Sequence, residues 1–304
     1  MTTPPEKTPL PLSDTVVGKL SDTIRDRLAL EPYLVVLSGS EQGKQFKLHS
    51  SQHVFGREPA ADIMISDPKI SRRHGMLSIY RRHIVLEDLN STNGTYVNGQ
   101  RVEKHRIQLL DRIRVGDTFL KIDYKRCCEA KSEQALYQAA NIDAMTNILN
   151  RQAFMLRAQQ ALSFCKHHNT PLTVMMCDAD HFKLTNDNFG HLAGDQVLRD
   201  LARILNAKMR QEDLLARYGG EEFIILLRAI PADAAVALAE RIRSTVMRHV
   251  FRYHTLRIPT TLSIGLCSCR AGSSPSLKAL IQAADDALYR AKKNGRNRVE
   301  IDIL

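Results

Sequence analysis

The chain has 304 residues, of which 43% are hydrophobic and 25% are charged, and its formal net charge is +10 at pH 7. This length allows two ordinary domains, and the composition is typical of a soluble globular protein. No apolar run approaches the ~18 residues of a membrane-spanning helix, and the N-terminus lacks the apolar core of a secretory signal. The six cysteines show no CxxC pair and no zinc-like spacing, so we expect a cytoplasmic protein without a membrane segment.

The basic charge is divided among short clusters, such as Arg72-Arg73 and Arg81-Arg82, and is not concentrated in one helix or tail. A positive balance of this size permits a nucleic-acid partner, but no aromatic stacking platform accompanies the clusters. Phosphorylated peptides and nucleotides account for the sign of the charge equally well. We therefore expect nucleic acid to be the least favoured of these partners.

Residues 1–31 begin rich in proline and polar residues, and a short helical pattern follows from Val16 to Leu30. This composition predicts an N-terminal tail that is partly disordered. Residues 32–122 show short alternating apolar runs, separated by hairpin-turn signals such as Asn93-Gly94 and Asn98-Gly99. Many strands at short spacing predict an all-β sandwich.

Polar and basic residues gather in the predicted loops of this sandwich. They are Gly56-Arg57, Ser71-Arg72-Arg73-His74 and Asn90-Ser91-Thr92-Asn93-Gly94-Thr95. Arginine, hydroxyl and amide groups together offer a set of donors to a phosphate dianion. In this order and spacing the residues resemble the forkhead-associated (FHA) domain, which binds phosphothreonine peptides.

The FHA resemblance implies that Arg57, Ser71 and Thr92 contact the phosphate and that Asn93 holds the peptide backbone. Arg72 stands where some members have asparagine, and it either adds a phosphate contact or faces solvent. The implied partner is a phosphothreonine-containing protein or a phosphorylated threonine in the N-terminal tail of another chain. The alternative is that these polar groups only satisfy turns.

Residues 123–142 connect this sandwich to the rest of the chain, and they lack proline and glycine. Helix formers predominate, so we expect a linker helix. Ala130, Leu136 and Ala140 form only a weak apolar stripe, which is too short to establish a two-stranded coiled coil. A solvated spacer is the alternative.

In residues 143–304 the pattern changes to helices alternating with strands. The expected strands are Leu172–Cys177, Phe223–Leu227, Thr260–Cys269 and Arg298–Ile303, and the expected helices are 152–167, one around 197–205, 231–250 and 277–293. This order predicts an α+β domain in which helices cover a mixed sheet. We expect the first two of these strands to be neighbours.

Two acidic clusters indicate the chemistry of this domain. Asp178 directly follows an apolar strand, and Glu221-Glu222 follow the tight turn expected at Gly219-Gly220. If the turn abuts the end of the Asp178 strand, two or three carboxylates meet. Oxygen ligands suit Mg²⁺, which takes its remaining ligands from water and phosphates. The residues therefore predict a Mg²⁺–nucleotide site, and the alternative is a solvated acidic turn.

Longer motifs surround these carboxylates. They are Asp143–Arg151, Asp178–Asp187, Gly190-His191, Gly194-Asp195, Arg217–Phe223 and Ala287–Asn297. Together they resemble the GGDEF family of diguanylate cyclases, in a GGEEF variant with a nucleotide-cyclase palm-like fold. Members join two GTP molecules into cyclic di-GMP, with one GTP bound by each subunit of a homodimer. Asn147 stands where the first motif usually has glycine, and asparagine can still take a positive φ.

The GGDEF resemblance implies a role for each matching residue. Asp178 and Glu221 would ligate Mg²⁺ or Mn²⁺, assisted by the Ala179 carbonyl. Glu221 is also the candidate catalytic base for the 3′-hydroxyl, and Glu222, the second expected catalytic carboxylate, lies close enough for a further metal contact. The implied substrate-binding residues are Asn186 and Asp195 for the guanine edge, and Lys292, Arg296 and Lys183 for the triphosphate.

Arg210 and Asp213 occupy the register of the family's product-inhibition site, an RxxD motif that binds cyclic di-GMP. Arginine stacks on guanine and forks to its acceptors, which makes that role chemically reasonable. An ordinary surface ion pair is the alternative.

Three functional hypotheses result. The first is an active diguanylate cyclase, regulated by phosphothreonine recognition at the FHA-like module and by its product. The second is a non-catalytic receptor for cyclic di-GMP or GTP, in which the FHA-like module is a scaffold. The chain keeps the complete Gly-Gly-Glu-Glu-Phe set and the metal aspartate, which favours the first hypothesis. The third, a nucleic-acid binder, rests only on the net charge.

Overall fold

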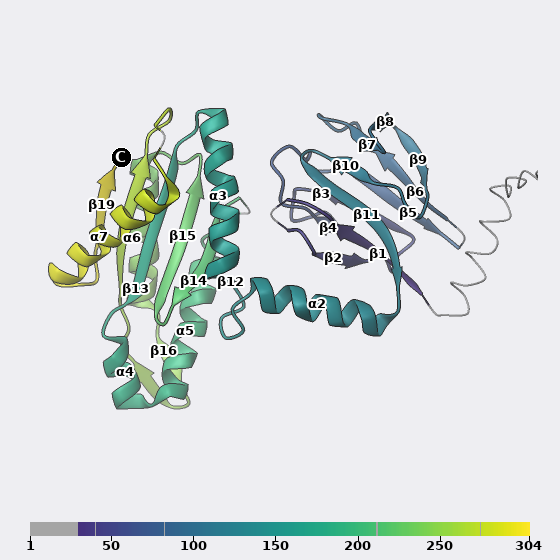
Figure 1. Ribbon diagram of the computed structural model, residues 1–304. Helices are drawn as coiled ribbons and strands as arrows, with labels where there is room; N and C mark the ends of the chain where they lie inside the picture. The colour runs from purple at the N-terminus through teal and green to yellow at the C-terminus, as the bar shows by residue number, and fades with distance from the viewer. Residues whose placement is uncertain (1–29, 40, 82, 211, 274) are drawn as a thin grey trace, which may run out of the picture. The chain divides into compact units, whose positions relative to one another are not determined.

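The computed structural model describes residues 30–304 except residues 40, 82, 211 and 274 (Figure 1). Residues 1–29, which hold nearly all of the expected N-terminal tail and its helical pattern, lie outside the described residues. Glu31, the last residue of the expected tail, belongs to the first strand. Contacts divide the chain into two compact units, unit 1 (Met1–Ala135) and unit 2 (Leu136–Leu304). None of the helices in the described part of the chain is long and apolar enough to cross a membrane.

Unit 1 contains two packed β-sheets. One sheet has the strand order β2-β1-β11-β10-β7-β8, and the other has the order β4-β3-β5-β6-β9. The strands are β1 (Glu31–Val36), β2 (Gln45–Lys47), β3 (Gln52–Gly56), β4 (Ile63–Met64), β5 (Gly75–Tyr80), β6 (His83–Asp88), β7 (Thr95–Val97), β8 (Gln100–Val102), β9 (Lys104–Ile107), β10 (Ile113–Val115) and β11 (Thr118–Lys125). Buried side chains of both sheets, such as Leu34, Leu77 and Ile122, form one core. The predicted all-β sandwich is confirmed.

The two asparagine–glycine pairs of unit 1 have different roles. Asn98-Gly99, with φ angles of 51° and 86°, forms the expected hairpin turn between β7 and β8. For Asn93-Gly94 the hairpin prediction is wrong, because this pair lies between β6 and β7, which belong to different sheets. The Asp88 carboxylate accepts hydrogen bonds from the hydroxyls of Ser91 and Thr95, each at 2.6 Å, and so closes this segment into a loop.

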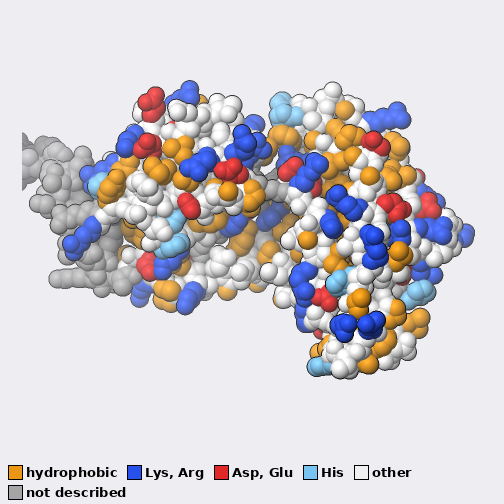
Figure 2. Space-filling model, turned by 180° about the vertical axis from the view of Figure 1, so that it is seen from behind, with side chains coloured by type: hydrophobic (Ala, Val, Ile, Leu, Met, Phe, Trp, Pro, Cys, Tyr) orange, Lys and Arg blue, Asp and Glu red, His pale blue; other side chains and the backbone are white. Residues whose placement is uncertain are grey.

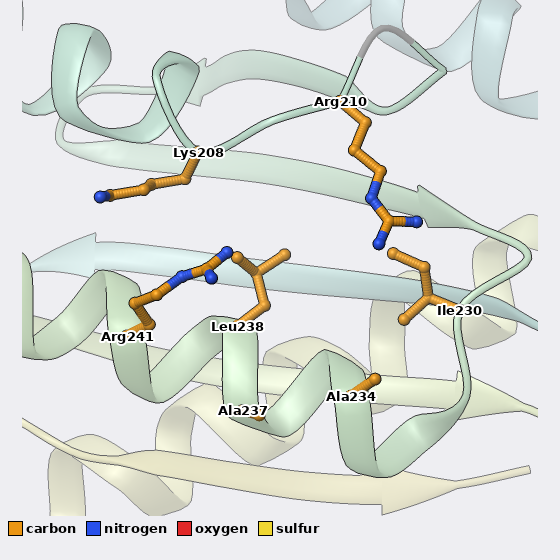
Figure 3. A pocket seen from close by; sticks show the side chains of 7 residues that line it. All are labelled: Lys208, Arg210, Ile230, Ala234, Ala237, Leu238 and Arg241. Atoms are coloured by element: carbon orange, nitrogen blue, oxygen red, sulfur yellow. The ribbon is translucent and has the colours of Figure 1, made fainter.

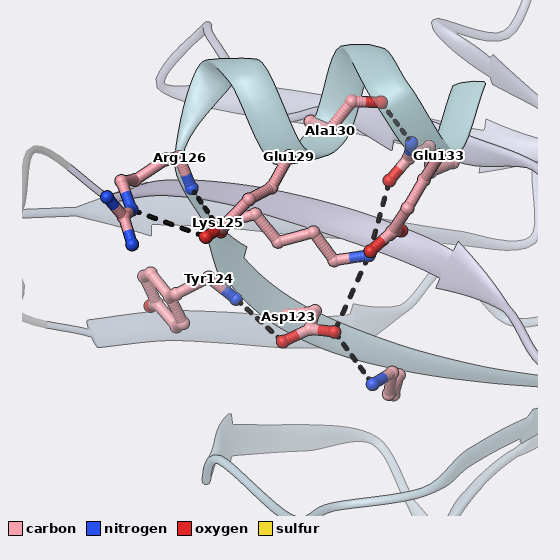
Figure 4. Close-up of polar contacts among 9 residues, drawn as sticks. Asp123, Tyr124, Lys125, Arg126, Glu129, Ala130 and Glu133 are labelled. Atoms are coloured by element: carbon pink, nitrogen blue, oxygen red, sulfur yellow. Dashed lines mark hydrogen bonds and ion pairs between the residues drawn. The ribbon is translucent and has the colours of Figure 1, made fainter. Parts of the chain in front are cut away.

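Helix α2 (Cys127–Asn141) follows β11 directly. Polar contacts tie its first turns to unit 1 (Figure 4): Gln45 Nε2 donates to the Ala130 carbonyl at 2.7 Å, and Lys125 pairs with Glu133. Ala130 is also the buried residue of the helix and packs against β1. Within the weak apolar stripe noted in the sequence, Ala130 is therefore buried, and its contacts lie within unit 1.

Unit 2 contains a six-stranded sheet in the order β12-β14-β15-β13-β18-β19, with a parallel pair at each edge and antiparallel pairs between them. Its strands are β12 (Leu149–Asn150), β13 (Leu172–Ala179), β14 (Leu214–Gly219), β15 (Glu222–Arg228), β18 (Leu262–Cys269) and β19 (Val299–Ile303), beside a hairpin of β16 (Phe251–Tyr253) and β17 (Leu256–Ile258). Its helices are α3 (Arg151–His168), α4 (Phe182–Phe189), α5 (His191–Asn206), α6 (Ala232–Arg248) and α7 (Leu277–Lys293). The predicted mixed sheet with helices is confirmed, and β13 and β15 are neighbours as expected.

Every residue of the central strand β13 is buried, and its side chains alternate between two cores. Met175 and Cys177 pack in the cluster that contains α5 and α6, and Val174 and Met176 pack in the cluster that contains α3 and α7. A strand covered on both faces appears in the sequence as a continuous apolar run. The helix expected around residues 197–205 is α5, and α4, which the sequence pattern did not predict, precedes it.

Candidate functional sites

The acidic residues of the GGEEF segment lie beside Asp178. In the antiparallel pairing of β13 and β15, Asp178 is directly opposite Glu222. The Ala179 amide donates to the Glu221 carbonyl at 3.4 Å. Gly220, with a φ of 49°, forms the turn that precedes both glutamates. The structure therefore brings the three expected carboxylates to one end of the two strands.

Asp178 lies in a buried and charged environment. Its side chain is 8% exposed, and Lys292 Nζ lies 2.7 Å from its Oδ2. Burial raises the pKa of Asp178 to about 6, while Lys292 opposes this rise and Glu221 and Glu222 add to it. Burial also raises the pKa of Glu222. Negative charges gathered in a poorly solvated place favour a bound cation.

This set of donors fits a hard divalent cation. Carboxylates and a backbone carbonyl are the oxygen ligands that Mg²⁺ accepts, and it usually binds one or two carboxylates together with water and phosphates. Among the described residues, no three His, Cys, Asp or Glu side chains are grouped closely enough to hold a metal ion by themselves. The arrangement is therefore an open site, which fits a cation that shares its ligands with a bound triphosphate.

A second polar group lies where α4 meets α5. A Cβ at Gly194 would lie 1.9 Å from Asn186 Oδ1, so a larger residue there would displace the Asn186 side chain. Asn186 Oδ1 is buried and has no hydrogen-bond partner among the described residues. A buried acceptor of this kind costs free energy unless a ligand or water satisfies it. Asp195, the next residue after Gly194, is half-buried, whereas Lys183 on α4 is exposed.

The two remaining cations expected to hold phosphates come from one end of α7. Lys292 lies in the last turn of the helix and contacts Asp178, and Arg296 lies half-buried in the loop that follows. Helix α7 approaches the sheet closely at Gly265 of β18, where a Cβ would lie 2.1 Å from the Leu288 backbone nitrogen. Because of this close packing, Lys292 lies at the end of β13, beside Asp178.

Arg210 and Asp213 are joined through the backbone of one turn. The Asp213 carboxylate accepts a hydrogen bond from the Arg210 amide at 2.8 Å. Within the described residues no ion pair joins the two side chains, and Asp213 Oδ1 is buried without a partner. Burial raises the pKa of Asp213. The surface ion pair considered as an alternative is therefore absent.

The Arg210 side chain instead lines a pocket of about 230 Å³ between the turn that precedes β14 and helix α6 (Figure 3). Two further cations, Lys208 and Arg241, line the same pocket. Its floor is apolar and consists of Ile230, Ala234, Ala237 and Leu238. Three cations above an apolar floor suit a planar ligand that carries negative charge.

In unit 1, the loops that hold the FHA-like residues contact one another. The Thr92 amide donates to Ser71 Oγ at 3.0 Å, and the Arg57 amide donates to the Ser71 carbonyl at 3.1 Å. Asn93 Nδ2 donates to the Lys69 carbonyl at 2.7 Å. The side chains of Arg57, Thr92 and Asn93 are exposed. The structure therefore brings the residues expected to bind the phosphopeptide together at the surface.

His74 and Arg72 have different positions in these loops. His74 is fully buried and its Nδ1 accepts a hydrogen bond from the Ser71 amide at 3.1 Å, as a bracing residue would. Burial lowers the pKa of His74. Arg72 is exposed, and its carbonyl lies so close to Gly56 that a Cβ there would be 2.0 Å away.

The family model described as "Diguanylate cyclase, GGDEF domain" matches residues 140–298. The chain belongs to the GGDEF family. Over 175 residues it is 38% identical to diguanylate cyclase A of Treponema denticola, covering 57% of this chain and 47% of that protein. It is 38% identical over 164 residues to the diguanylate cyclase DgcP of Pseudomonas aeruginosa, covering 54% of this chain and 24% of that protein.

A crystal structure of the coiled coil and GGDEF domain of DgcB from Caulobacter crescentus in complex with c-di-GMP is similar to the chain with a TM-score of 0.54. The identity is 29%, and the match covers 58% of this chain and 92% of that one. The chain spans less than half the length of the curated relatives named above. A further family model, the cytoplasmic domain of an inner membrane component of T3SS, matches residues 35–125. This match differs from the FHA family that the loops resemble and supports the sandwich fold alone.

The GGDEF domain also contains a bridge that the sequence pattern did not indicate. Arg217 donates from Nε to the Gly220 carbonyl at 2.9 Å and from Nη1 to Asp143 Oδ1 at 3.3 Å. Asp143 in turn accepts from Thr146 Oγ1 at 2.6 Å. Asn147 follows with a φ of 57°, the positive value expected at this position. The first motif of the domain therefore braces the glycine turn, and only the shared motif residues could have indicated this contact.

Proposed function

We propose that this chain is a diguanylate cyclase, which joins two GTP molecules into cyclic di-GMP and releases pyrophosphate within a homodimer. The observation that carries the proposal is the pairing of Asp178 with Glu222 beside the glycine turn of a GGDEF domain. The relatives named above are also diguanylate cyclases. The alternative, a non-catalytic receptor, is typical of members that lack one of these carboxylates, and this chain retains them.

In this proposal different elements hold the base and the phosphates of GTP. Asn186 and Asp195 bind the guanine edge, because an amide and a carboxylate complement its acceptors and donors. Asn186 Oδ1, for which the described residues supply no partner, supports this assignment. Lys292 and Arg296 hold the triphosphate, with Lys183 as an additional cation. Lys292 neutralises Asp178 before substrate binds and can exchange that contact for a phosphate oxygen.

Asp178, Glu221 and the Ala179 carbonyl would hold Mg²⁺ or Mn²⁺, with Glu222 as a further contact. The cation would supply neutralisation of the charge on the triphosphate. Glu221 accepts the proton of the 3′-hydroxyl of one GTP. The 3′-oxygen then bonds to the α-phosphorus of the second GTP, and the bond from that phosphorus to pyrophosphate breaks. The same step with the two nucleotides exchanged closes the ring and releases a second pyrophosphate. Each subunit holds one GTP, so the two sites must face each other, and positioning supplies much of the rate.

Incubation of the purified chain with GTP and Mg²⁺, followed by chromatographic analysis of the products, tests this proposal. We expect cyclic di-GMP from the wild type and ~100-fold less from Asp178→Asn. Asp286→Asn is the matched control, because Asp286 is exposed on α7 and accepts a hydrogen bond from Gln282 Nε2. GTP binding without any product, at concentrations where the chain is dimeric, would favour the receptor instead.

We also propose that the pocket beside Arg210 and Asp213 binds cyclic di-GMP and inhibits the enzyme. The cations of Arg210, Lys208 and Arg241 support this, since the product carries two phosphates and two planar bases. Occupation of this pocket would then report the level of product to the catalytic residues of the same domain.

In unit 1 we propose a phosphothreonine-peptide site. Arg57, Ser71 and Thr92 contact the phosphate, Arg72 adds a contact from the same loop, and Asn93 holds the peptide backbone. The contacts between the two loops and the exposure of Arg57 support this assignment. The ligand is a phosphorylated protein or a phosphorylated tail of another chain, and its binding would control when two GGDEF domains meet.

A further inference from the structure

We propose that Asp180 is a positioning residue of the triphosphate site, which acts by setting the conformation of the loop that carries Arg296. This inference rests on the proposed function, in which Arg296 holds phosphates. Asp180 is separated from Asp178 by one residue and is only 5% exposed. Asp178 contacts Lys292, whereas the Asp180 carboxylate accepts hydrogen bonds from two hydroxyls and a backbone amide.

Both carboxylate oxygens of Asp180 are already occupied by protein donors. Ser263 Oγ donates to Oδ1 at 2.6 Å, and Thr261 Oγ1 donates to Oδ2 at 2.6 Å. The Asn297 backbone amide donates to Oδ2 at 3.0 Å. The carboxylate therefore links the end of β13 to the start of β18 and to the loop after α7. A buried carboxylate with three donors is held in one orientation.

The loop that Asp180 holds has an unfavourable backbone conformation. Gly295, Arg296 and Asn297 have φ angles of 113°, 60° and 45°, so two consecutive residues with side chains lie in the left-handed region. Such conformations persist only where the surroundings impose them. Asp180 supplies one contact, and Arg243 Nη1 supplies another by donating to Asn297 Oδ1 at 2.9 Å. Without the Asp180 contact we expect the loop to relax and Arg296 to leave its position.

The two neighbouring aspartates thus serve the two phosphate-binding cations by different routes. Asp178 contacts Lys292 directly, whereas Asp180 acts on Arg296 through the backbone. This predicts that replacing the carboxylate by an amide has a large effect at position 178 and a small effect at position 180. Asn at position 180 can direct its oxygen to the Asn297 amide and its NH₂ to the Ser263 hydroxyl, which can also accept. A metal ligand or a required charge would not survive that change.

The test compares Asp180→Ala and Asp180→Asn in the full chain. In the absence of nucleotide and metal, we expect hydrogen exchange of the Asn297 amide to accelerate at least ~10-fold in Asp180→Ala and less than ~3-fold in Asp180→Asn. We expect Asp180→Ala to bind a non-reactive GTP analogue ~10-fold more weakly, with the Mg²⁺ concentration for half-maximal binding unchanged. Asp180→Asn should bind within ~3-fold of the wild type.

Equal loss of binding in both variants, or a higher Mg²⁺ requirement, would overturn the proposal, as would unchanged exchange at Asn297 in Asp180→Ala. If Asp180→Ala does not fold, Ser263→Ala takes its place, because it frees one carboxylate oxygen and should accelerate exchange at Asn297; an unchanged rate overturns the inference. These measurements need no turnover. Failure of the wild type to make cyclic di-GMP would therefore contradict the proposed function, whereas the exchange and binding measurements would still test the role of Asp180.

Discussion

The two polar sites of this chain are supported by different kinds of structure. In the GGDEF domain, Asp178 and Glu222 lie at the ends of β13 and β15, and the pairing of those strands determines their distance. In unit 1, Arg57 and Thr92 lie on exposed loops, and single hydrogen bonds such as that from the Thr92 amide to Ser71 hold the loops together. The first site is formed at the ends of two paired strands with Asp178 buried, and the second is formed by exposed loops.

This difference has physical consequences for each site. Burial raises the pKa of Asp178 to about 6, so the folded domain carries an electrostatic cost that a bound cation and substrate can relieve. The exposed donors of unit 1 carry no such cost and lose little when no ligand is present. We therefore expect changes in the first site to affect chemistry and stability, and changes in the second to affect binding alone.

The largest expected effect separates the two sites completely. Glu221→Ala should lower the rate of cyclic di-GMP formation by ~100- to 1,000-fold, because the base for the 3′-hydroxyl and a metal contact are lost together. Its affinity for a phosphothreonine peptide should equal that of the wild type. Product analysis and isothermal titration on the same preparation check both. A variant that loses peptide binding as well would show that the two sites depend on each other.

Arg57→Ala is the reciprocal change. Loss of a charged donor to the phosphate should weaken binding of a phosphothreonine peptide by ~10- to 100-fold. The cyclase rate without peptide should not change. Arg81→Ala, an exposed arginine in the turn after β5, is the matched control. Fluorescence anisotropy with the phosphorylated and unphosphorylated peptide measures the effect, and equal binding of both peptides by the wild type would refute the phosphothreonine site.

Arg210→Ala should raise the concentration of cyclic di-GMP needed for half-inhibition by ~10-fold, because the guanidinium that lines the pocket is removed. The initial rate without product should remain within twofold of the wild type. Initial rates measured over a range of added cyclic di-GMP provide the readout. Unchanged inhibition would place the product site elsewhere or show that the product competes at the active site.

The smallest expected effect is a pH dependence of stability. The folded pKa of Asp178, about 6, lies above its ordinary value of 3.8, so the folded state binds this proton more tightly than the unfolded state. Asp178 therefore costs no stability below pH 4 and an increasing amount as the pH rises to 6. Relative to the wild type, Asp178→Asn should gain ~2 kcal/mol of unfolding free energy across that window. Urea unfolding at pH 4, 5, 6 and 7 with a chelator measures this gain, and a difference that does not vary with pH would contradict it.

Much of the fold could be predicted because its signals are local. Alternating apolar residues indicated the sandwich, and the continuous apolar run before Asp178 indicated a buried strand. The predicted helix 277–293 matches α7 at both ends, and in the structure Ser276 caps its start. Some short elements were not predicted: β8 and β10 have three residues each, and α4 has eight.

By itself, the sequence determined the candidate site residues and most of the elements that hold them, α4 excepted, since both follow from motifs and short-range periodicity. Only the tertiary structure decided how those residues meet. It placed Asp178 opposite Glu222 and Lys292 beside Asp178. It left Asn186 Oδ1 without a hydrogen-bond partner in the described part of the chain, and it placed the Asn297 amide on the Asp180 carboxylate. These contacts join residues far apart in the chain, and strand register and the close packing of α7 determine them. No local pattern in the sequence encodes those distances.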